Sequence, residues 1–539
     1  MAKILVCDEL AEAGLQILSQ AGQVVVRTGM DEAQLQAEAA DADALVLRSG
    51  SHITAPVIEN ASCLRIIARA GVGVDNIDVA AATRCGVLVV NSPLGNTLAA
   101  AEHTIALMLA AARRIPQAAE ALRQGCWSRS SFMGHQLFGK TLGLIGLGKV
   151  GFEVAKRAAA FGMKVTAWDP YIAPERARTA GVELTDSLDT LVSKADYLSL
   201  HCTLNADTRD LVSHRLLGMM KSDAVLINCA RGGLVDEDAL AEALSDGTIA
   251  GAALDVFADE PTTNAALLGL PNLIATPHLG ASTEEAQIEV ALDAARQVVE
   301  VLAGRMPRWP VNAPLLSPEA QATVQPYRPL AAALGTLARS LIESLPHRIE
   351  LAAGTDLSAE HLAYLRGELV AAMLRDIVDS PVNFINASTV ATERGIELAQ
   401  AKTEQTGGYS RLLQVTVDTG AGRTLIAGAL LNGSEPRVVH LDGYRLELLP
   451  RQTAVLIWNA ESGKPGFVGM LGTLLGDAGI NITGIQVAPE TVTGVGLLAV
   501  TVAADIPEAL REQLQGLSGV RRVEIVRLDD SMTDSNGVI

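Results

Sequence analysis

The chain has 539 residues, which is long enough for several domains, because single hydrophobic cores stop growing at roughly 250–300 residues. Its 61 acidic and 42 basic residues give a formal net charge of −19, which opposes binding to nucleic-acid phosphates and to an anionic membrane surface. We therefore expect neither a nucleic-acid nor a membrane partner. An anionic substrate has to be recognised by a few local arginines.

The cysteines and the N-terminus indicate a soluble cytoplasmic protein. All six cysteines fall in the first 230 residues without a CxxC pair, so we expect reduced thiols and no metal site. The start, MAKILVCDEL, reads as a strand followed by acidic residues, unlike a signal peptide. The most apolar stretch, residues 98–114, carries Glu102, His103, Arg113 and Arg114, and is predicted to be a buried helix rather than a membrane span.

The first 300 residues show the rhythm of parallel βα units. Short apolar runs at residues 3–7, 44–48, 64–68 and 87–91 alternate with helical segments, and the same pattern repeats with six strands between residues 141 and 276. Long helices are predicted at 97–114 and 283–302. The fold class of this half is α/β, with two Rossmann-like doubly wound domains.

The second half has a different organisation. Four prolines within residues 305–318 mark a linker. Helices near 330–344 and 360–375 then precede four strand-like runs, which indicates an α+β domain with mostly antiparallel strands. From residue 453 the order is βαββαβ, a ferredoxin-like unit, and the polar tail after residue 529 is expected to be frayed.

A dinucleotide site is predicted in LGLIGLGKVG, where Gly146, Gly148 and Gly151 follow a strand and open a helix. The first glycine permits a tight turn, the second lets the backbone approach a pyrophosphate, and the third lets helix pack on strand. Asp169 ends the next strand, where a carboxylate accepts a hydrogen bond from the ribose 2′-hydroxyl. Because that carboxylate repels a 2′-phosphate, the expected cofactor is NAD.

Side chains suited to hydride-transfer chemistry follow later strands of the same sheet. Arg231 follows the run AVLIN, Asp255 and Glu260 follow IAGAAL, and His278 comes after LIAT. Arg231 can hold a substrate carboxylate as a fork. His278 can take the hydroxyl proton as general base, and Glu260 can stabilise the imidazolium that results.

These motifs carry a resemblance to a known family. The stretches RAGVGVDNID, NSPLGNT, AAEHT, KTLGLIGLGKVG, INCARGGLVDE, GAALDVF, DEP and TPHLGAST resemble the most specific motifs of the D-isomer-specific 2-hydroxyacid dehydrogenases, and the match spans nearly the whole chain. The resemblance implies an NAD-dependent enzyme with Arg231, Glu260 and His278 as catalytic residues. It further implies oxidation of 3-phospho-D-glycerate to 3-phosphohydroxypyruvate, the first step of phosphorylated L-serine biosynthesis.

The resemblance also implies ligand contacts and domains. The cofactor contacts it implies are Val72, Gly146, Gly148, Lys149, Val150, Gly151, Asp169, Cys202, Cys229, Ala230, Arg231, Asp255, His278, Gly280 and Ala281. The substrate contacts it implies are Arg48, Ser49, Gly73, Asn96 and Arg129, the last matching a basic residue that reaches a neighbouring subunit's phosphate, within a homodimer or homotetramer. The implied domains are 1–96 plus 279–310 for substrate, 97–278 for NAD, 315–450 for an allosteric-substrate-binding-like domain and 453–529 for an ACT-like domain.

The ACT-like segment departs from the family pattern where an amino-acid effector binds. An aspartate is usual two residues before Pro-Gly, and here that position is Gly463. Asn481 is retained, whereas Pro489 replaces a basic residue. Because the effector's ammonium needs a carboxylate, we predict weak or absent inhibition by L-serine, unless Glu461 reaches the site from the loop.

Three other functions are compatible with parts of the same sequence. A glyoxylate or hydroxypyruvate reductase of the same family shares Arg231, Glu260 and His278 but leaves some 230 C-terminal residues unexplained. An NAD-sensing corepressor has no use for a full catalytic trio. A free-standing amino-acid sensor accounts for the least of the chain.

Overall fold

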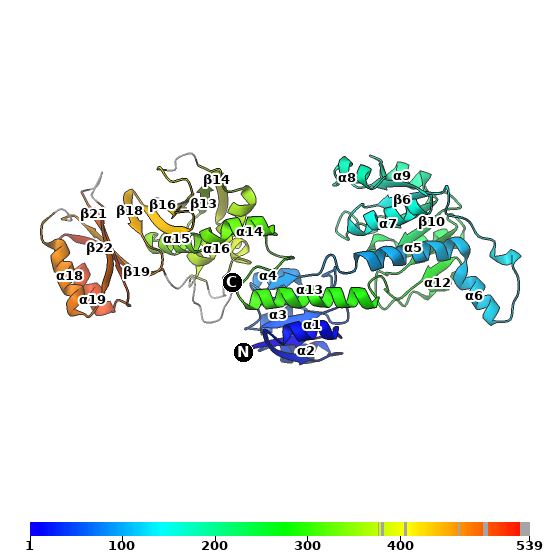
Figure 1. The fold of residues 1–539 in the computed structure, drawn as a ribbon, viewed down its shortest axis with the longest axis horizontal. Helices are drawn as coiled ribbons and strands as arrows, with labels where there is room; N and C mark the ends of the chain where they lie inside the picture. The colour runs from blue at the N-terminus through cyan, green and yellow to red at the C-terminus, as the bar shows by residue number, and fades with distance from the viewer. Residues whose placement is uncertain (376, 379–381, 404–406, 462–463, 489–493, 529–539) are drawn as a thin grey trace.

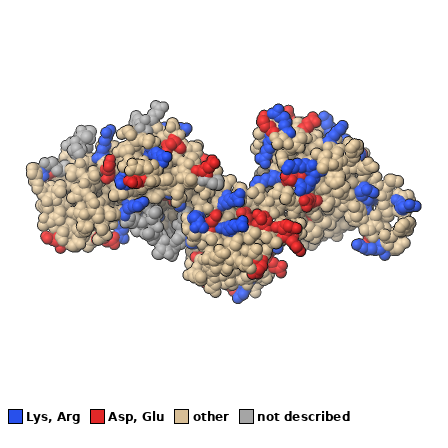
Figure 2. Space-filling view, viewed as in Figure 1, with Lys and Arg blue, Asp and Glu red and all other residues tan. Residues whose placement is uncertain are grey.

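A computed structural model shows four sheets arranged along an elongated molecule (Figure 1). It describes residues 1–375, 377–378, 382–403, 407–461, 464–488 and 494–528. None of the helices within these ranges has the length and apolar character required to cross a membrane. On the face shown in Figure 2, Lys and Arg side chains are scattered among Asp and Glu.

The first sheet is parallel, in the order β2-β1-β3-β4-β5. Its strands are β1 (Ala2–Val6), β2 (Gly22–Val26), β3 (Ala44–Leu47), β4 (Ile66–Arg69) and β5 (Leu88–Val90). Successive strand residues point to opposite faces, so Leu5 packs with α2 (Glu32–Ala39), α3 (Ala55–Asn60) and α4 (Val79–Arg84). Ile4 faces α1 (Glu12–Leu18) and the returning helix α13 (Glu284–Leu302).

The second sheet is also parallel, in the order β12-β11-β10-β9-β6-β7-β8. Its strands are β6 (Thr141–Ile145), β7 (Lys164–Trp168), β8 (Glu183–Leu184), β9 (Tyr197–Leu200), β10 (Val225–Asn228), β11 (Gly251–Leu254) and β12 (Leu273–Ala275). Helix α5 (Thr97–Arg113) enters this unit and packs on α7 (Lys149–Ala160). Smaller helices are α8 (Pro174–Thr179), α9 (Leu188–Lys194), α10 (His214–Leu217), α11 (Glu237–Ser245) and α12 (Ala265–Leu268). The predicted pair of doubly wound units is confirmed, although the edge strands β2 and β8 were not predicted.

The third sheet is mostly antiparallel, in the order β14-β13-β15-β16-β17-β18. It contains β13 (Arg348–Ala353), β14 (Glu397–Lys402), β15 (Leu412–Thr419), β16 (Gly422–Leu431), β17 (Glu435–Leu441) and β18 (Tyr444–Leu448). Its helices are α14 (Pro318–Val324), α15 (Arg328–Leu341), α16 (Ala359–Leu374) and α17 (Ala387–Glu393). The sequence predicted α15, α16 and the last four strands, but it missed the parallel pair β13 and β14.

The fourth unit has the predicted βαββαβ order: β19 (Thr453–Asn459), α18 (Phe467–Asp477), β20 (Ile482–Ala488), β21 (Gly496–Val502), α19 (Glu508–Gln515) and β22 (Val520–Arg527). Its sheet runs β20-β21-β19-β22. One face packs on α18 and α19 through Val455 and Ile457. The opposite face, with Ala454 and Leu456, lies in the same apolar cluster as Leu330 of α15. The third and fourth units therefore share one core. The tail predicted to fray, 529–539, lies outside the described residues.

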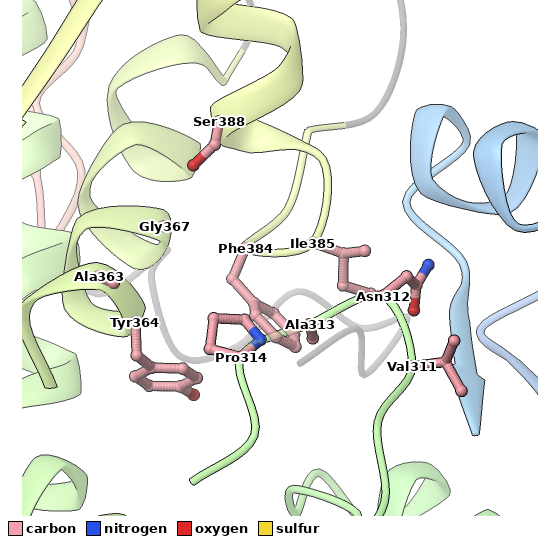
Figure 3. A pocket seen from close by; sticks show the side chains of 10 residues that line it. All are labelled: Val311, Asn312, Ala313, Pro314, Ala363, Tyr364, Gly367, Phe384, Ile385 and Ser388. Carbon is pink, nitrogen blue, oxygen red and sulfur yellow. The ribbon is translucent and has the colours of Figure 1, made fainter. Parts of the chain in front are cut away.

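The proline-rich linker attaches the third unit to the first. The Asn312 side chain donates to the Val87 carbonyl at 2.9 Å and accepts from the Val89 N–H at 2.8 Å. Asn383 and Asn386 donate to backbone carbonyls at the C-terminal end of α4 and just after it, at 2.7 and 3.0 Å. A cavity of about 290 Å³ lies at this junction, with Tyr364 and Phe384 among its lining residues (Figure 3).

Candidate active site

The glycine-rich turn has the geometry that a dinucleotide requires. Gly146 has φ 92°, in the left-handed region that favours glycine. A Cβ at Gly148 would meet nothing within 4 Å, so the turn is open to a ligand. A Cβ at Gly151 would strike the Gly146 carbonyl, which shows the close helix packing. Lys149 begins α7, whose N-terminal amides and dipole favour a pyrophosphate.

Asp169 lies beside that turn. Its carboxylate accepts the Leu147 N–H at 2.8 Å and the Tyr171 N–H at 2.9 Å. The first bond ties the end of β7 to the glycine-rich turn itself. The carboxylate is therefore fixed next to the predicted pyrophosphate position, as a ribose ligand must be.

His278 and Glu260 form a hydrogen-bonded pair. The Nδ1 of His278 lies 2.6 Å from a carboxylate oxygen of Glu260, and the His278 side chain is 42% exposed. Since a carboxylate only accepts, Nδ1 carries the proton and Nε2 is the nitrogen that can face a substrate hydroxyl. The His278 backbone has φ 54° and is held by an N–H bond to the Asp255 carbonyl at 2.8 Å.

The Glu260 carboxylate is kept ionised by its surroundings. Burial by itself raises its pKa, but the hydrogen bonds from His278 and from the Phe257 N–H outweigh burial, so the pKa of Glu260 is lowered. An ionised carboxylate here stabilises a positively charged imidazole. The pair therefore has the arrangement of a general base with an orienting partner.

Arg231 connects the second α/β unit to the first. Its Nε donates to a carboxylate oxygen of Asp75 at 3.0 Å. The backbone after Arg231 approaches the Phe257 segment so closely that a Cβ at Gly232 would overlap the Phe257 carbonyl group. This contact brings the loop of Arg231 against the loop that carries Glu260, the partner of His278.

Asp255 has a structural role that the sequence did not predict. Its side chain is fully buried and accepts from His103 Nε2 at 3.1 Å and Thr276 Oγ1 at 2.6 Å. It also accepts the N–H groups of Leu279 and Gly280 at 2.7 and 2.8 Å. These protein donors occupy the carboxylate expected to contact the cofactor. Asp255 therefore fixes the segment that carries His278. His103 is part of the quoted AAEHT motif, but the sequence offered no reason to assign it a role.

Arg69 is the main residue that the sequence analysis missed. It ends β4 inside the quoted motif RAGVGVDNID, and a Cβ at Gly71 would overlap its guanidinium. Its Nε is buried with no hydrogen-bond partner among the described residues. Burial and the nearby charges of Arg231 and Arg48 lower the pKa of Arg69 to about 10. The signal was an arginine at the end of a strand, followed by the glycine-containing run Ala-Gly-Val-Gly.

The other predicted substrate residues lie on the same loops of the first unit. Arg48 follows β3, and its N–H donates to Asp8 at 2.6 Å, while Ser49 beside it is exposed. A Cβ at Gly73 would overlap the Arg231 guanidinium. Asn96 precedes α5, and its Oδ1 is buried without a partner in the described part of the chain.

Arg129 is not brought to these residues within one chain. It precedes the short 3-10 helix Ser130–Phe132, after α6 (Ile115–Arg123), and it is exposed. Helix α6 projects from the second unit on the side away from the first (Figure 1). The same segment exposes Trp127 by 79% and Met133 by 78%. Its predicted phosphate contact therefore requires a second copy of the chain.

Of the remaining predicted cofactor contacts, one lies in the first turn of α7 and the others lie in loops that follow strands. They are Val72, Val150, Cys202, Cys229, Ala230, Gly280 and Ala281. Burial raises the pKa of the Cys202 thiol to about 11 and that of Cys229 to about 12. Both sulfurs therefore stay protonated near neutral pH and line the site as small apolar groups.

The effector loop of the fourth unit is described only in part. Gly463 and Pro489, at which the sequence departs from the family pattern, lie outside the described residues. Glu461 binds the Lys464 ammonium at 2.6 Å and accepts the Ser518 hydroxyl at 3.1 Å. Its carboxylate is thus already engaged within its own unit. Asn481 precedes β20 and is exposed.

Comparisons with known proteins agree with this geometry. Residues 105–280 match the family model "D-isomer specific 2-hydroxyacid dehydrogenase, NAD binding domain", and residues 323–442 match "D-3-phosphoglycerate dehydrogenase intervening domain". The D-3-phosphoglycerate dehydrogenase of Methanocaldococcus jannaschii is 40% identical, covering 98% of this chain and 100% of that protein. That of Synechocystis is 41% identical, covering 98% and 95%.

Solved structures match the first two units. A protein of Thermus thermophilus, TT0316, has 38% identity and a TM-score of 0.54, covering 57% of this chain and 99% of that chain. The D-lactate dehydrogenase of Aquifex aeolicus, complexed with NAD and lactic acid, has 27% identity and a TM-score of 0.51, covering 56% and 96%. With relatives of at least 30% identity over nearly its full length, the chain belongs to the D-3-phosphoglycerate dehydrogenases, NAD-binding members of the D-isomer specific 2-hydroxyacid dehydrogenases.

Proposed function

We propose that the protein oxidises 3-phospho-D-glycerate to 3-phosphohydroxypyruvate with NAD, as the first step of phosphorylated L-serine biosynthesis. The observation that carries the proposal is the group formed by Arg231, Arg69 and Arg48 across the two α/β units, together with the packing of the Arg231 loop against the loop that carries Glu260, the partner of His278. A phosphorylated hydroxy acid has two anionic ends. The group therefore has the charge that such a substrate needs.

The proposed chemistry is a proton transfer coupled to a hydride transfer. Nε2 of His278 takes the proton of the C2 hydroxyl, and Glu260 stabilises the imidazolium formed. The bound NAD supplies the hydride acceptor. Arg231 exchanges its Asp75 partner for the substrate carboxylate and holds it as a bidentate pair. The products are the 2-oxo acid, NADH and one proton, which His278 later releases.

The phosphate is proposed to bind Arg69 and Arg48, with Asn96 donating through its amide. Arg69 supports this because its buried Nε has no hydrogen-bond partner among the described residues, and a buried unpaired donor is unfavourable. Arg129 from a second copy completes the site. The protein is therefore proposed to be a homodimer or homotetramer, joined in part by the exposed segment after α6.

The domain limits and the location belong to the same proposal. Substrate binds to residues 1–96 and 279–310, NAD to 97–278, and the regulatory half comprises an allosteric-substrate-binding-like domain, 315–450, and an ACT-like domain, 453–529. The six cysteines are free, which suits the reducing cytoplasm.

The test compares kcat/KM for 3-phospho-D-glycerate, D-glycerate and D-lactate by NADH formation. We expect the phosphorylated substrate to be preferred by at least about 100-fold, since two or more charge-assisted hydrogen bonds are lost without the phosphate. Equal values for 3-phospho-D-glycerate and D-glycerate would contradict the proposal.

Arg69→Met sharpens this test. It should raise KM for 3-phospho-D-glycerate and leave the constants for D-glycerate nearly unchanged. Arg65→Met is the matched control, because Arg65 directly precedes β4 at its opposite end and binds the Val301 carbonyl at 3.0 Å. The control should change stability without changing the preference between the two substrates.

A further inference from the structure

A tryptophan of the returning segment lies against the cofactor helix. The ring of Trp309 is 5.1 Å from the Lys149 ammonium and 5.1 Å from the Arg308 guanidinium. Lys149 begins α7 in the second unit, whereas Trp309 follows α13 and belongs with the first unit. The contact therefore crosses from one α/β unit to the other.

The Trp309 backbone is held firmly to the first unit. Its N–H donates to Gln297 Oε1 at 2.8 Å, and its carbonyl accepts the Asn91 N–H at 3.4 Å. Gln297 is 1% exposed and also donates to the Asn91 carbonyl at 2.9 Å. Asn91 in turn donates through Nδ2 to the Val72 carbonyl at 2.6 Å. The ring is thus fixed to the loop that carries the predicted substrate residues.

The Lys149 side chain, in contrast, is an exposed and flexible chain at the start of a helix. Partial burial of the ammonium and, to a smaller extent, the charge of Arg176 lower the pKa of Lys149. The positive end of the helix dipole also disfavours an ammonium at the helix N-terminus. An aromatic face attracts the ammonium through its quadrupole and holds it in place.

We propose that Trp309 is a positioning residue that holds the Lys149 ammonium beside the glycine-rich turn, ready for the cofactor's pyrophosphate. The inference rests on the proposed cofactor site and adds a residue that the site did not include. Because Trp309 is attached to the first unit, the position of the Lys149 ammonium depends on how the two units pack against each other. The affinity for the cofactor then depends on this packing as well. The contact therefore couples cofactor binding to closure of the substrate loops.

The experiment is a double-mutant cycle on NADH binding, read from NADH fluorescence with the full chain. Trp309→Leu should raise the Kd for NADH about three- to tenfold, the range expected for loss of a partly desolvated cation–π contact. The kcat at saturating NAD should change less than twofold. In a Lys149→Met background, Trp309→Leu should have no further effect on the Kd, because its partner is already absent.

Conservative variants separate positioning from packing. Trp309→Phe keeps an aromatic face, and Lys149→Arg keeps a cation. Both variants should bind NADH with a Kd within about twofold of wild type. The matched control is Trp458→Leu, since Trp458 makes the same kind of contact with Arg522, at 5.3 Å, in the fourth unit. That variant should leave the Kd for NADH unchanged.

Two results would overturn the inference: an unchanged Kd in Trp309→Leu, or an equal rise in the presence and absence of Lys149. If Trp309→Leu does not fold, the Trp309→Phe and Lys149 variants still test the inference. Lys149→Met must raise the Kd for NADH, whereas Lys149→Arg must keep it near the wild-type value. Binding needs no turnover, so these outcomes are separate from the proposed substrate. Failure of the wild type to bind NADH would instead contradict the proposed function.

Discussion

The two halves of the molecule join their units in different ways. The first two α/β units keep separate cores and meet through polar or charged side chains, such as Arg231 with Asp75 and Lys149 with Trp309. The last two share one apolar cluster, in which Leu456 lies with Leu330 of α15. A polar joint can open for ligands, whereas a shared core makes two units move as one body.

The largest expected effect lies at the polar joint. His278→Ala should lower kcat by about 10²- to 10⁴-fold, because a positioned general base contributes that much, while the Kd for NADH changes little. The measurement is initial-rate NADH formation at saturating substrates. His214→Ala is the matched control, since His214 also pairs with a glutamate, Glu242, at 3.0 Å, but on the surface. More than half of the wild-type kcat in His278→Ala would remove the general-base assignment.

The shared core of the second half should respond through stability. Leu456→Ala should lower the free energy of unfolding by about 2–5 kcal/mol, as a fully buried leucine does when truncated, and should split the calorimetric transition of the third and fourth units. Ile457→Ala is the control, because Ile457 points to the other face of β19 and packs within the fourth unit alone. Separate transitions of the two units in the wild type would show that the core does not couple them.

A histidine that packs against the glycine-rich turn, His201, should make the first half sensitive to acid. Burial lowers the pKa of His201 to about 4, so the folded state keeps it neutral while the unfolded chain takes up a proton below about pH 6.5. The stability contribution is present above pH 6.5 and falls as the pH decreases toward 4, by at most about 2 kcal/mol at pH 5. Urea midpoints at pH 7 and pH 5 measure it. His201→Gln should show a smaller loss, and an equal loss would exclude His201 as the source.

The smallest effect is expected from L-serine. Glu461, the carboxylate two residues before the position of the usual aspartate, is engaged by Lys464 and Ser518. We therefore predict that millimolar L-serine changes the initial rate less than twofold. Half-inhibition at micromolar serine would contradict this, and Glu461→Ala would then show whether that carboxylate binds the effector.

Much of the fold was predictable because burial imposes a repeating pattern. The runs of β6, β9 and β10 are apolar on both faces, as parallel strands between helices must be. The strand β14 was missed because its side chains are largely exposed or half-buried at a sheet edge, so its alternation is weak.

The site was predictable where chemistry follows a strand directly. His278, Glu260 and Arg231 belong to that class. Arg69 and Asp255 also lie at strand ends, but their roles, like that of His103, depend on contacts between segments far apart in the chain. A sequence pattern shows which side chains lie at the end of a strand. It does not show which of them bind residues of another segment or unit.

Hydrogen exchange of the full chain, with and without NAD plus 3-phosphohydroxypyruvate, tests the contrast between the joints most directly. This pair cannot turn over, so it holds the site closed. Protection should rise together in residues 69–76 of the first unit and in 146–151 and 229–233 of the second, while α15 and β19 exchange as one body with no change in their relative rates. Protection confined to one α/β unit, or β19 opening independently of α15, would contradict the account.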